Sequence, residues 1–324
     1  MSMKKPSLCI VTPALADANN GNWQTARRWA RMLSGDYRVR LARAWSPGDE
    51  ADGLLALHAR RSAPSVAAFA EAHPQRPLVL ALTGTDLYRD IASDASAQRS
   101  LVLAHRLIVL QEQGPLSLPP ELRASCEVIF QSGTRRRTLA RTTDHLRAVM
   151  VGHLRDEKWP QTLFEAARLI GPHEGILIDH IGAALDPALG EAARATALAC
   201  PHYRWLGSLP HAVARSRIQR AHVLVHTSRM EGGAHVLVEA VLSGTPVLAS
   251  RIAGNVGMLG ADYGGYFPAG NAPALAQALR ECRADLAAPA GRLATLQAQC
   301  GLRAPLFDRG TEHARLSSLL KGLF

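Results

Sequence analysis

The sequence predicts an α/β protein made of two parallel sheets whose strands are joined by crossover helices. Short, nearly continuous apolar runs recur along the chain, as is typical of strands buried on both faces. Stretches with apolar residues at three- and four-residue spacing lie between these runs and predict helices. The length of 324 residues suits two domains of ordinary size, and 47% apolar content is enough to bury both cores.

The predicted strands fall into two series. The first comprises residues 7–14, 77–86, 106–112 and 127–132, and the second comprises residues 146–154, 175–182, 221–228 and 245–250. Helical periodicity is clearest in residues 23–33, 66–72, 161–170 and 236–242. Because strands and helices alternate almost throughout, each series predicts a parallel sheet with right-handed crossovers.

Residues 132–144 separate the two series. This segment is polar and rich in Arg and Thr, and its hydrophobic periodicity lapses, so we interpret it as a solvated linker. We expect a first domain at 1–135, to which residues 308–324 are added, and a second domain at 140–305. Residues 308–324, after Pro305, predict an amphipathic helix that packs across the two domains.

Composition excludes several classes of function. The net charge of +10 indicates anionic partners. However, the basic cluster at 134–141 has no interleaved aromatic side chain and aromatics make up only 5% of the chain, so we expect no nucleic acid. No apolar run reaches the roughly 18 residues of a membrane helix, and we expect a cytoplasmic protein without secretion signal or anchor. Five scattered cysteines without CxxC spacing predict free thiols.

Residues 227–250 place two carboxylates around the start of a predicted helix. Glu231 lies in a glycine-containing loop after an apolar strand, and Glu239 lies about two turns later inside the helix. Both can face one ligand at the carboxyl end of the strand, where a carboxylate accepts hydrogen bonds from sugar hydroxyls. The N–H groups of Gly233 and Ala234 are available to phosphate. The alternative is an amphipathic helix with acids on its surface.

The loop after the first predicted strand combines a flexible turn with a helix start. Asparagine and glycine permit positive φ and expose backbone N–H groups. We expect this loop to bind an anion, with N–H groups at the turn meeting phosphate and arginines of the helix behind them. The turn residues are Asn19, Asn20, Gly21 and Asn22, and the arginines are Arg27, Arg28 and Arg31. The alternative is a simple Asn-Gly turn.

Three other loops follow predicted strands and carry polar groups or glycine. Thr83, Thr85 and Asp86 surround the flexible Gly84. Arg155 and Lys158 lie before a helix opened by Pro160, where cations can clamp a diphosphate. Gly182 and Gly207 end strands, where a planar base can approach the backbone. For each set the alternative is ordinary loop chemistry, since exposed polar and basic side chains are common in loops.

Missing motifs narrow the chemistry further. The sequence contains no GxxxxGK[ST] loop, no GxGxxG fingerprint, no HExxH and no DxD pair, so we expect neither a metal nor another cofactor. His222 and His226 flank a predicted strand, and we interpret them as packing or solvent-facing histidines. Ser228 lacks the GxSxG elbow of a hydrolase.

Taken together, the Gly21 loop, GHLRDEK and EGGAHVLVEAVLSGTPV resemble the family 4 glycosyltransferases. The resemblance implies the GT-B fold, in which two Rossmann-like domains face each other across a cleft. It implies that Lys158 holds the diphosphate of a nucleotide sugar, that Glu231 contacts the sugar and that Glu239 binds the ribose. The Arg that usually follows the glycine is His153 here, and we expect Arg155 to replace it.

The resemblance also assigns the remaining glycine-loop residues. Gly232, Gly233 and Ala234 are implied to line the donor site, with Gly233 and Ala234 in place of the usual Phe-Gly. The segments NGNWQTARRW, LTGTDLY and VGHLRDEKWP resemble one branch of the superfamily, the selenosugar synthases of selenoneine biosynthesis. That likeness implies transfer of GlcNAc or Glc from a UDP-sugar to selenophosphate, forming a C–Se bond and releasing UDP and phosphate.

Three features favour this branch over enzymes that use a sugar acceptor. The first domain is short, the chain is basic, and the loop at residues 83–86 lacks the His found beside Asp in many relatives, so no obvious general base is present. An anionic selenium nucleophile needs none. Thr83, Thr85, Asp86 and Arg27 are then the expected acceptor residues. The alternatives are transfer to a hydroxyl group of a glycan or lipid intermediate and a non-catalytic module that binds sugar nucleotides.

Overall fold

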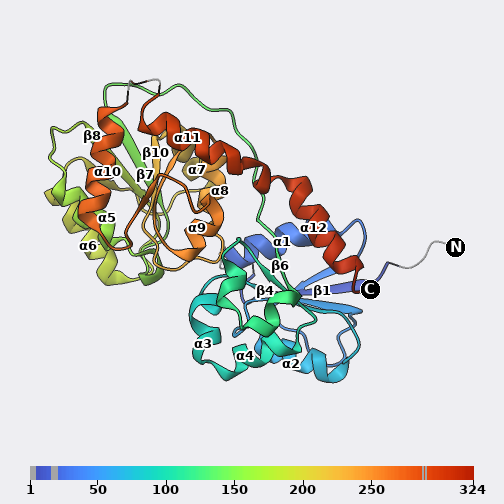
Figure 1. Ribbon diagram of the computed structural model, residues 1–324. Coiled ribbons are helices and arrows are strands. Elements are labelled where there is room, and N and C mark those ends of the chain that lie inside the picture. The colour runs from blue at the N-terminus through green and yellow to red at the C-terminus, as the bar shows by residue number, and fades with distance from the viewer. Residues whose placement is uncertain (1–4, 16–20, 287, 289) are drawn as a thin grey trace. The chain divides into compact units, whose positions relative to one another are not determined.

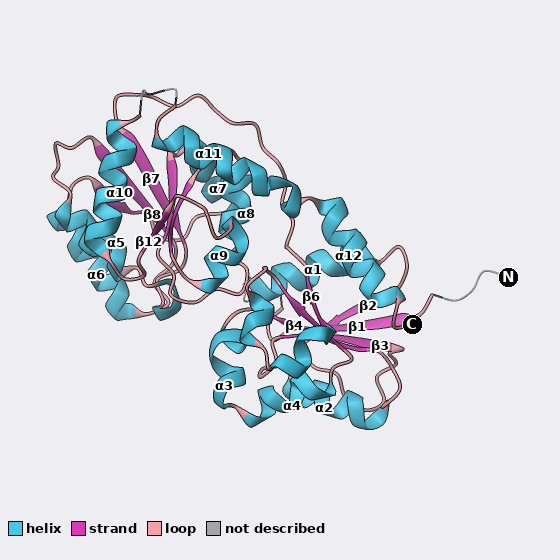
Figure 2. Cartoon of the chain, in the orientation of Figure 1, coloured by secondary structure: helices cyan, strands magenta, loops and turns pink. Residues whose placement is uncertain are grey.

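The computed structural model describes residues 5–15, 21–286, 288 and 290–324. The chain divides into two compact units, one of Met1–Ser132 with Asp308–Phe324 and one of Gly133–Phe307. Each unit contains a parallel six-stranded sheet flanked by helices (Figure 1, Figure 2). The predicted α/β class with two parallel sheets is therefore confirmed.

The sheet of the first unit has the strand order β2-β1-β3-β4-β5-β6. Its strands are β1 (Ser7–Val11), β2 (Arg38–Ala42), β3 (Gly53–Leu57), β4 (Leu78–Leu82), β5 (Arg106–Val109) and β6 (Cys126–Val128). The chain leaves β1 in one direction to form β2 and then crosses to the other side to form β3. The order therefore reverses between β1 and β3, and crevices for ligands form at the carboxyl ends of strands at such a point.

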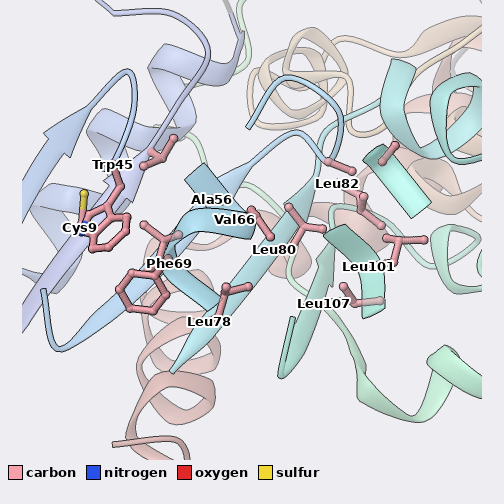
Figure 3. Packing of buried hydrophobic residues seen from close by; sticks show 14 of the residues in the cluster. Cys9, Trp45, Ala56, Val66, Phe69, Leu78, Leu80, Leu82, Leu101 and Leu107 are labelled. Carbon is pink, nitrogen blue, oxygen red and sulfur yellow. The ribbon is translucent and has the colours of Figure 1, made fainter. Parts of the chain in front are cut away.

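Helices cover both faces of this sheet (Figure 2). They are α1 (Gly21–Leu33), α2 (Ala63–Ala72), α3 (Ile91–Ser93), α4 (Ala95–Leu103) and α12 (Arg309–Lys321), with a π-helix η1 (Asp86–Asp90) and 3-10 turns η2 (Gly114–Ser117) and η3 (Pro120–Ser125). Successive side chains of a strand point to opposite faces of the sheet, so one strand contributes side chains to two cores. Leu78, Leu80 and Leu82 of β4 join the core beside α2 and α4 (Figure 3), whereas Val79 and Ala81 join the core beside α1 and α12.

A buried carboxylate joins α12 to the first unit. Glu312 is 1% exposed and accepts hydrogen bonds from Arg28 Nε at 3.0 and 3.1 Å and from Trp29 Nε1 at 2.7 Å. It also accepts from the backbone N–H and the hydroxyl of Ser132, at 2.9 and 2.5 Å. Leu316 and Leu320 of the same helix are fully buried in the core beside α1. Residues 308–324 therefore complete the first unit.

The sheet of the second unit has the order β12-β11-β10-β7-β8-β9. Its strands are β7 (Leu146–Val151), β8 (Ile176–Ile181), β9 (Tyr203–Trp205), β10 (Val223–His226), β11 (Val247–Ser250) and β12 (Tyr266–Phe267). The chain builds β8 and β9 on one side of β7 and then returns to the other side with β10. The order of this sheet reverses between β7 and β10.

The helices of the second unit lie on both faces of its sheet (Figure 1). They are α5 (Gln161–Leu169), α6 (Pro187–Ala199), α7 (His211–Arg220), α8 (His235–Val241), α9 (Ala253–Leu259), α10 (Ala272–Ala284) and α11 (Arg292–Arg303), with 3-10 turns η4 (Asp156–Lys158) and η5 (Ala304–Phe307). Helices α5, α6 and α10 pack together, and α8 packs with α7 and α11. Among the described residues no helix is long and apolar enough to span a bilayer.

Three strands, β2, β3 and β12, were absent from the prediction, and β9 was expected only as a strand that ends at Gly207. β2 has the sequence RVRLA, in which charged and apolar residues alternate at a sheet edge, so it has no continuous apolar run. β3 is fully buried but only five residues long. β9 and β12 have three and two residues and close the edges of the second sheet. Short and edge strands carry too few buried positions for periodicity to reveal them.

The Arg-rich segment after Ser132 differs from the solvated linker that we expected. It has no regular secondary structure, but its backbone is hydrogen-bonded to the second unit. Arg136 N–H donates to Leu242 O at 2.8 Å, and Arg215 Nη2 donates to Thr134 O at 2.6 Å. The arginine side chains give the segment its polar composition, and these backbone bonds, which composition cannot show, fix its path.

Replacing Glu312 with Ala should destabilise the first unit by about 3 kcal/mol, because it leaves the partly buried Arg28 guanidinium without its counter-charge. Hydrogen exchange of the α1 and α12 amides, combined with urea unfolding, measures this change. The matched control is Glu71→Ala, which removes an exposed acid at the end of α2 and should change stability by less than about 0.5 kcal/mol. Unchanged protection of α12 in Glu312→Ala would contradict the assignment.

Candidate functional site

The strongest candidate site lies where the strand order reverses in the second unit. The loops after β7 and β10 lie side by side there, because the two strands are neighbours. The first loop contains the turn η4, and the second leads into α8. Arg229 N–H donates to Glu157 O at 3.0 Å, which joins the two loops directly.

Lys158 ends the turn η4 and extends towards the second loop. Its stem runs beside Gly152, where an added Cβ would lie 3.5 Å from the Lys158 Cδ. Its carbonyl accepts from the Thr227 hydroxyl at 2.8 Å, and the next residue, Trp159, has the left-handed φ of 45°. These features direct the Lys158 ammonium to Glu231, whose Oε1 lies 2.5 Å from Nζ. The structure therefore brings together the two residues that we expected to contact diphosphate and sugar.

Glu231 is held from two sides. Its backbone packs on α9, because a Cβ added to Gly254 would lie 2.0 Å from the Glu231 carbonyl oxygen. Below it, His226 Nε2 lies 3.4 Å from Oε1 and is 2% exposed. Burial opposes ionisation of Glu231, but the Lys158 ammonium and His226 outweigh burial and hold the pKa of this carboxyl well below its usual range. The carboxylate is charged and oriented.

His226 is a correction to the sequence interpretation. Its place at the end of β10 suggested packing or solvent contact, but its ring lies against the Glu231 carboxylate. Burial lowers the pKa of His226, while Glu231 opposes that shift. A spacing of four residues on a strand carries no sign of this contact, since the partner comes from the following loop.

The second cation expected near Lys158 has a different environment. Arg155 is exposed, and its Nε lies 3.8 Å from Glu157 Oε2. His153 Nδ1 accepts from Ala183 N–H at 3.1 Å. Burial, with the neighbouring charges of Arg155 and Lys158, lowers the pKa of His153, which is therefore neutral near pH 7. Among the described residues, Arg155 has no contact that fixes it beside Glu231.

Glu239 lies on the second turn of α8 and is 6% exposed. Its Oε1 accepts from His211 Nε2 at 2.6 Å and lies 3.6 Å from His235 Nδ1, while Arg215 Nη1 donates to its carbonyl. Burial opposes ionisation, yet these partners lower the pKa of Glu239 to about 2. The interpretation of Glu239 as a surface acid is wrong, since the side chain is buried among basic groups.

Two glycines of the second unit, Gly182 and Gly207, lie at the carboxyl ends of the strands in the same sheet. Gly182 follows β8 with φ of 157°, and a Cβ there would lie 2.0 Å from Gly152 O. Its N–H donates to Gly207 O at 2.8 Å, and Gly207 has φ of 65°. The residues Gly232, Gly233 and Ala234 form the approach to α8, which begins at His235. These positions keep the loops close to the strand ends.

In the first unit, the loop after β4 has a buried anchor. Asp86 is fully buried, and its carboxylate accepts from the N–H groups of Thr83 and Gly84 at 2.9 and 2.8 Å and from Ala59 N–H at 2.9 Å. Both oxygens are used, so we revise Asp86 from an acceptor contact to a residue that holds two loops. Thr83 and Thr85 are partly exposed at the strand end, as expected.

His58, at the carboxyl end of β3, is a polar residue that the sequence analysis did not identify. It follows β3, has a left-handed φ of 76° and is 2% exposed. Its Nε2 lies 3.1 Å from Thr85 Oγ1. The loop was overlooked because β3 itself was not predicted, and neither a positive φ at a histidine nor a contact between residues 27 positions apart leaves a sequence signal.

The expected anion turn before α1 is only partly described. Asn19 and Asn20 lie outside the described residues, and Gly21 and Asn22 form the first turn of the helix. Arg27 and Arg31 are exposed on α1. Arg28 is a correction, because its guanidinium is bound to Glu312 and supports the fold instead of an anion.

Residues 132–286 match the model of the family described as glycosyl transferases group 1. No curated protein matches the chain. Among solved structures, HepE from Anabaena in complex with UDP and glucose has a TM-score of 0.74 at 16% identity, covering 98% of this chain and 100% of HepE. Sucrose-phosphate synthase from Thermosynechococcus elongatus has a TM-score of 0.74 at 18% identity, covering 99% of each chain.

The pneumococcal O-GlcNAc transferase GtfA, in complex with UDP and GlcNAc, has a TM-score of 0.66 at 16% identity over 93% of this chain and 60% of GtfA. At such identities the likeness shows the fold, which is the expected GT-B architecture of two α/β units. The family match covers most of the second unit, including Lys158, Glu231 and Glu239. The family match therefore concerns the second unit, and the likeness to solved structures concerns the fold of both units.

The pairing of Glu239 with His211 predicts a measurable titration. The Glu239 carboxylate raises the pKa of His211, so the pairing stabilises the folded state fully below about pH 6.5 and is lost as pH rises through the raised value. Glu239→Gln should return the pKa of His211 towards its usual range, as followed by NMR of the ring. Glu191→Gln, an exposed acid on α6, is the control. An unchanged His211 titration in Glu239→Gln would contradict the pairing.

Proposed function

We propose that this glycosyltransferase of group 1 transfers GlcNAc or Glc from a UDP-sugar to selenophosphate. The observation that carries the donor half of the proposal is the Lys158–Glu231 pair at the strand reversal of the second unit. The acceptor half rests on the resemblance of three sequence segments to selenosugar synthases and on the basic charge of the chain. Neither half invokes a metal or another cofactor.

The ion pair suits a donor with both an anionic and a hydroxylated part. The diphosphate of a UDP-sugar offers negative oxygens to the Lys158 ammonium, and the sugar offers hydroxyl donors to the Glu231 carboxylate. On donor binding, the Lys158 ammonium would exchange the Glu231 carboxylate for diphosphate oxygens. Glu231 would exchange the ammonium for sugar hydroxyl donors. His226 stays beneath Glu231 and keeps the carboxylate in place. We therefore assign Lys158 to the leaving diphosphate and Glu231 to the sugar.

Glu239 is the proposed ribose ligand. Its low pKa makes it a charged acceptor at every pH near neutrality, and adjacent ribose hydroxyls are suitable donors. His211, whose side chain is 76% exposed, can rotate away when a diol binds. Two structural relatives, HepE and GtfA, are in complex with UDP together with glucose or GlcNAc. That shared feature supports UDP as the nucleotide here.

The transfer can be written as a balanced reaction. Selenium of selenophosphate attacks C1 of the sugar, the C1–O bond to UDP breaks, and the electron pair leaves on the β-phosphate oxygen. Lys158 stabilises that charge, which is usually the dominant electrostatic contribution to such a step. Water then cleaves the P–Se bond to give the 1-selenosugar and phosphate. In this scheme Arg155 supplies a second cation, and Gly21 and Asn22 donate backbone N–H groups to phosphate.

Selenophosphate needs no deprotonation before attack, unlike a hydroxyl acceptor. The edge of the first unit fits that requirement, since both oxygens of Asp86 are occupied and His58 is buried behind Thr85. Thr83, Thr85 and Arg27 remain the proposed contacts of the acceptor. A glycan or lipid hydroxyl would instead require a base with access to the acceptor.

Lys158→Ala should lower kcat by about 100-fold or more while leaving the fold intact, because it removes the cation beside the leaving group. Steady-state release of UDP measures kcat, and circular dichroism checks folding. The matched control is Lys5→Ala, an exposed lysine of the first unit, which should retain full activity. Unchanged turnover in purified Lys158→Ala protein would refute the role of Lys158.

Mass spectrometry tests the acceptor directly. Incubation with selenophosphate and UDP-GlcNAc or UDP-Glc should give a product that carries the selenium isotope pattern and the mass of a selenosugar. Phosphate release should accompany UDP release in equal amounts. A glycosylated sugar alcohol or lipid in place of the selenosugar, under the same conditions, would favour a hydroxyl acceptor and reject selenophosphate.

A further inference from the structure

The strand order of the first unit marks a second reversal point with its own polar cluster. The order reverses between the neighbouring strands β1 and β3, and His58 is the first residue after β3. Thr85 follows the adjacent strand β4, and its hydroxyl lies 3.1 Å from His58 Nε2. A buried histidine and a partly exposed threonine therefore meet at the edge where parallel sheets bind ligands.

His58 is held in an unusual conformation by the surrounding residues. Its φ of 76° is rare for a side chain with a Cβ and is tolerated where the surroundings fix it. Ser62 Oγ donates to Leu57 O at 2.6 Å, and Ala59 N–H donates to Asp86 at 2.9 Å, so both neighbours of His58 are anchored. The ring is thereby turned towards Thr85 instead of solvent.

The hydrogen bonds of the ring define which nitrogen carries the proton. Burial lowers the pKa of His58, although the Asp86 carboxylate opposes this, and the ring is neutral near pH 7. Arg61 N–H donates to Nδ1 at 3.3 Å, so Nδ1 is an acceptor and the proton lies on Nε2. His58 therefore donates to Thr85 Oγ1. The Thr85 hydroxyl hydrogen is left to point at another acceptor.

The charges around this pair favour an anion as that acceptor. The carboxylates of Asp86 and Asp90 are buried, at 0% and 3% exposure, whereas Arg60 and Arg61 are exposed immediately after His58. Arg60 Nε lies 3.1 Å from Asp90 Oδ2, which holds the base of its guanidinium. Besides burial, the charges of Arg60 and Arg61 lower the pKa of the His58 ring, so both guanidinium groups lie near this pair. Together with the Thr85 hydroxyl they suit a tetrahedral oxyanion.

We propose that His58 is a positioning residue that aims the Thr85 hydroxyl at the oxyanion of the acceptor. The proposal rests on the proposed function for the identity of the reaction, but the binding of an oxyanion to the first unit can be tested without turnover. His58 itself does not touch the acceptor. It acts through Thr85, and Asp86 holds the loops of both residues in register.

Three substitutions separate positioning from folding. Thr85→Val removes the hydroxyl with little change in shape, and Thr85→Ser keeps it. His58→Asn shortens the side chain so that it no longer reaches Thr85, while asparagine tolerates the left-handed backbone. The matched control is His105→Asn, at the opposite edge of the sheet, where Nδ1 accepts from Leu78 N–H. If His58→Asn does not fold, the two Thr85 variants still test the proposal.

We expect the variants to weaken apparent affinity for the acceptor and not for the UDP-sugar. Thr85→Val and His58→Asn should each raise the acceptor KM about tenfold, as for one lost hydrogen bond, with the UDP-sugar KM within about twofold of wild type. Thr85→Ser should recover most of the acceptor affinity that Thr85→Val loses, and His105→Asn should resemble wild type. The double variant should be no worse than either single variant, because both act through one hydroxyl. Equal changes in both KM values, or additive losses, would overturn the proposal.

Calorimetric binding of inorganic thiophosphate gives the second readout. Wild-type protein should bind it, and Thr85→Val should bind it about tenfold more weakly. If wild-type protein binds thiophosphate in this Thr85-dependent manner but makes no glycosylated product, the proposed function fails. The proposal that Thr85 binds an oxyanion then stands. If it forms product but thiophosphate affinity and acceptor KM are unaffected by Thr85→Val, the proposal for Thr85 is wrong and the proposed function stands.

Discussion

The reversal of strand order within each parallel sheet is the constraint on which the rest of this structure depends. Strands buried on both faces leave only their ends open to solvent, and the loops at the carboxyl ends spread apart where the order reverses. In the second unit that point lies between β7 and β10, and in the first between β1 and β3. Lys158 and Glu231 lie at the first of these places, and His58 lies beside the second.

At the strand-order reversal of the second unit, the acidic side chains Glu231 and Glu239 are paired with basic side chains. Lys158 and Glu231 pair with each other, and the Glu239 carboxylate accepts a hydrogen bond from His211 and lies 3.6 Å from His235 Nδ1. A buried carboxylate without partners would be costly, so a site that binds a charged, hydroxylated ligand needs substitutes within the protein. Under the proposed function, the groups that pair with one another in this structure are the groups that a nucleotide sugar would engage.

Much of the candidate site could be predicted from the sequence. Lys158, Glu231 and Glu239 stand in two short motifs that can be found in the sequence. The structure places Lys158 and Glu231 in direct contact. His226, His211 and His58 could not be assigned in the same way. Each acts through a partner from another loop or helix, and Arg28, expected at an anion site, is instead fixed by Glu312, 284 positions away. Pairings between distant segments depend on packing, which local pattern does not encode.

The sequence by itself determined the α/β class, the two series of strands and the short motifs that hold Lys158, Glu231 and Glu239, because these depend on hydrophobic periodicity and on local pattern. Tertiary structure alone decided the order of the strands, the contacts that hold α12 on the first unit and the partners of the buried polar groups. The physical reason is the same in each case. A buried charge or a left-handed histidine is stable only with partners from elsewhere in the chain, and those partners are chosen by how the layers pack.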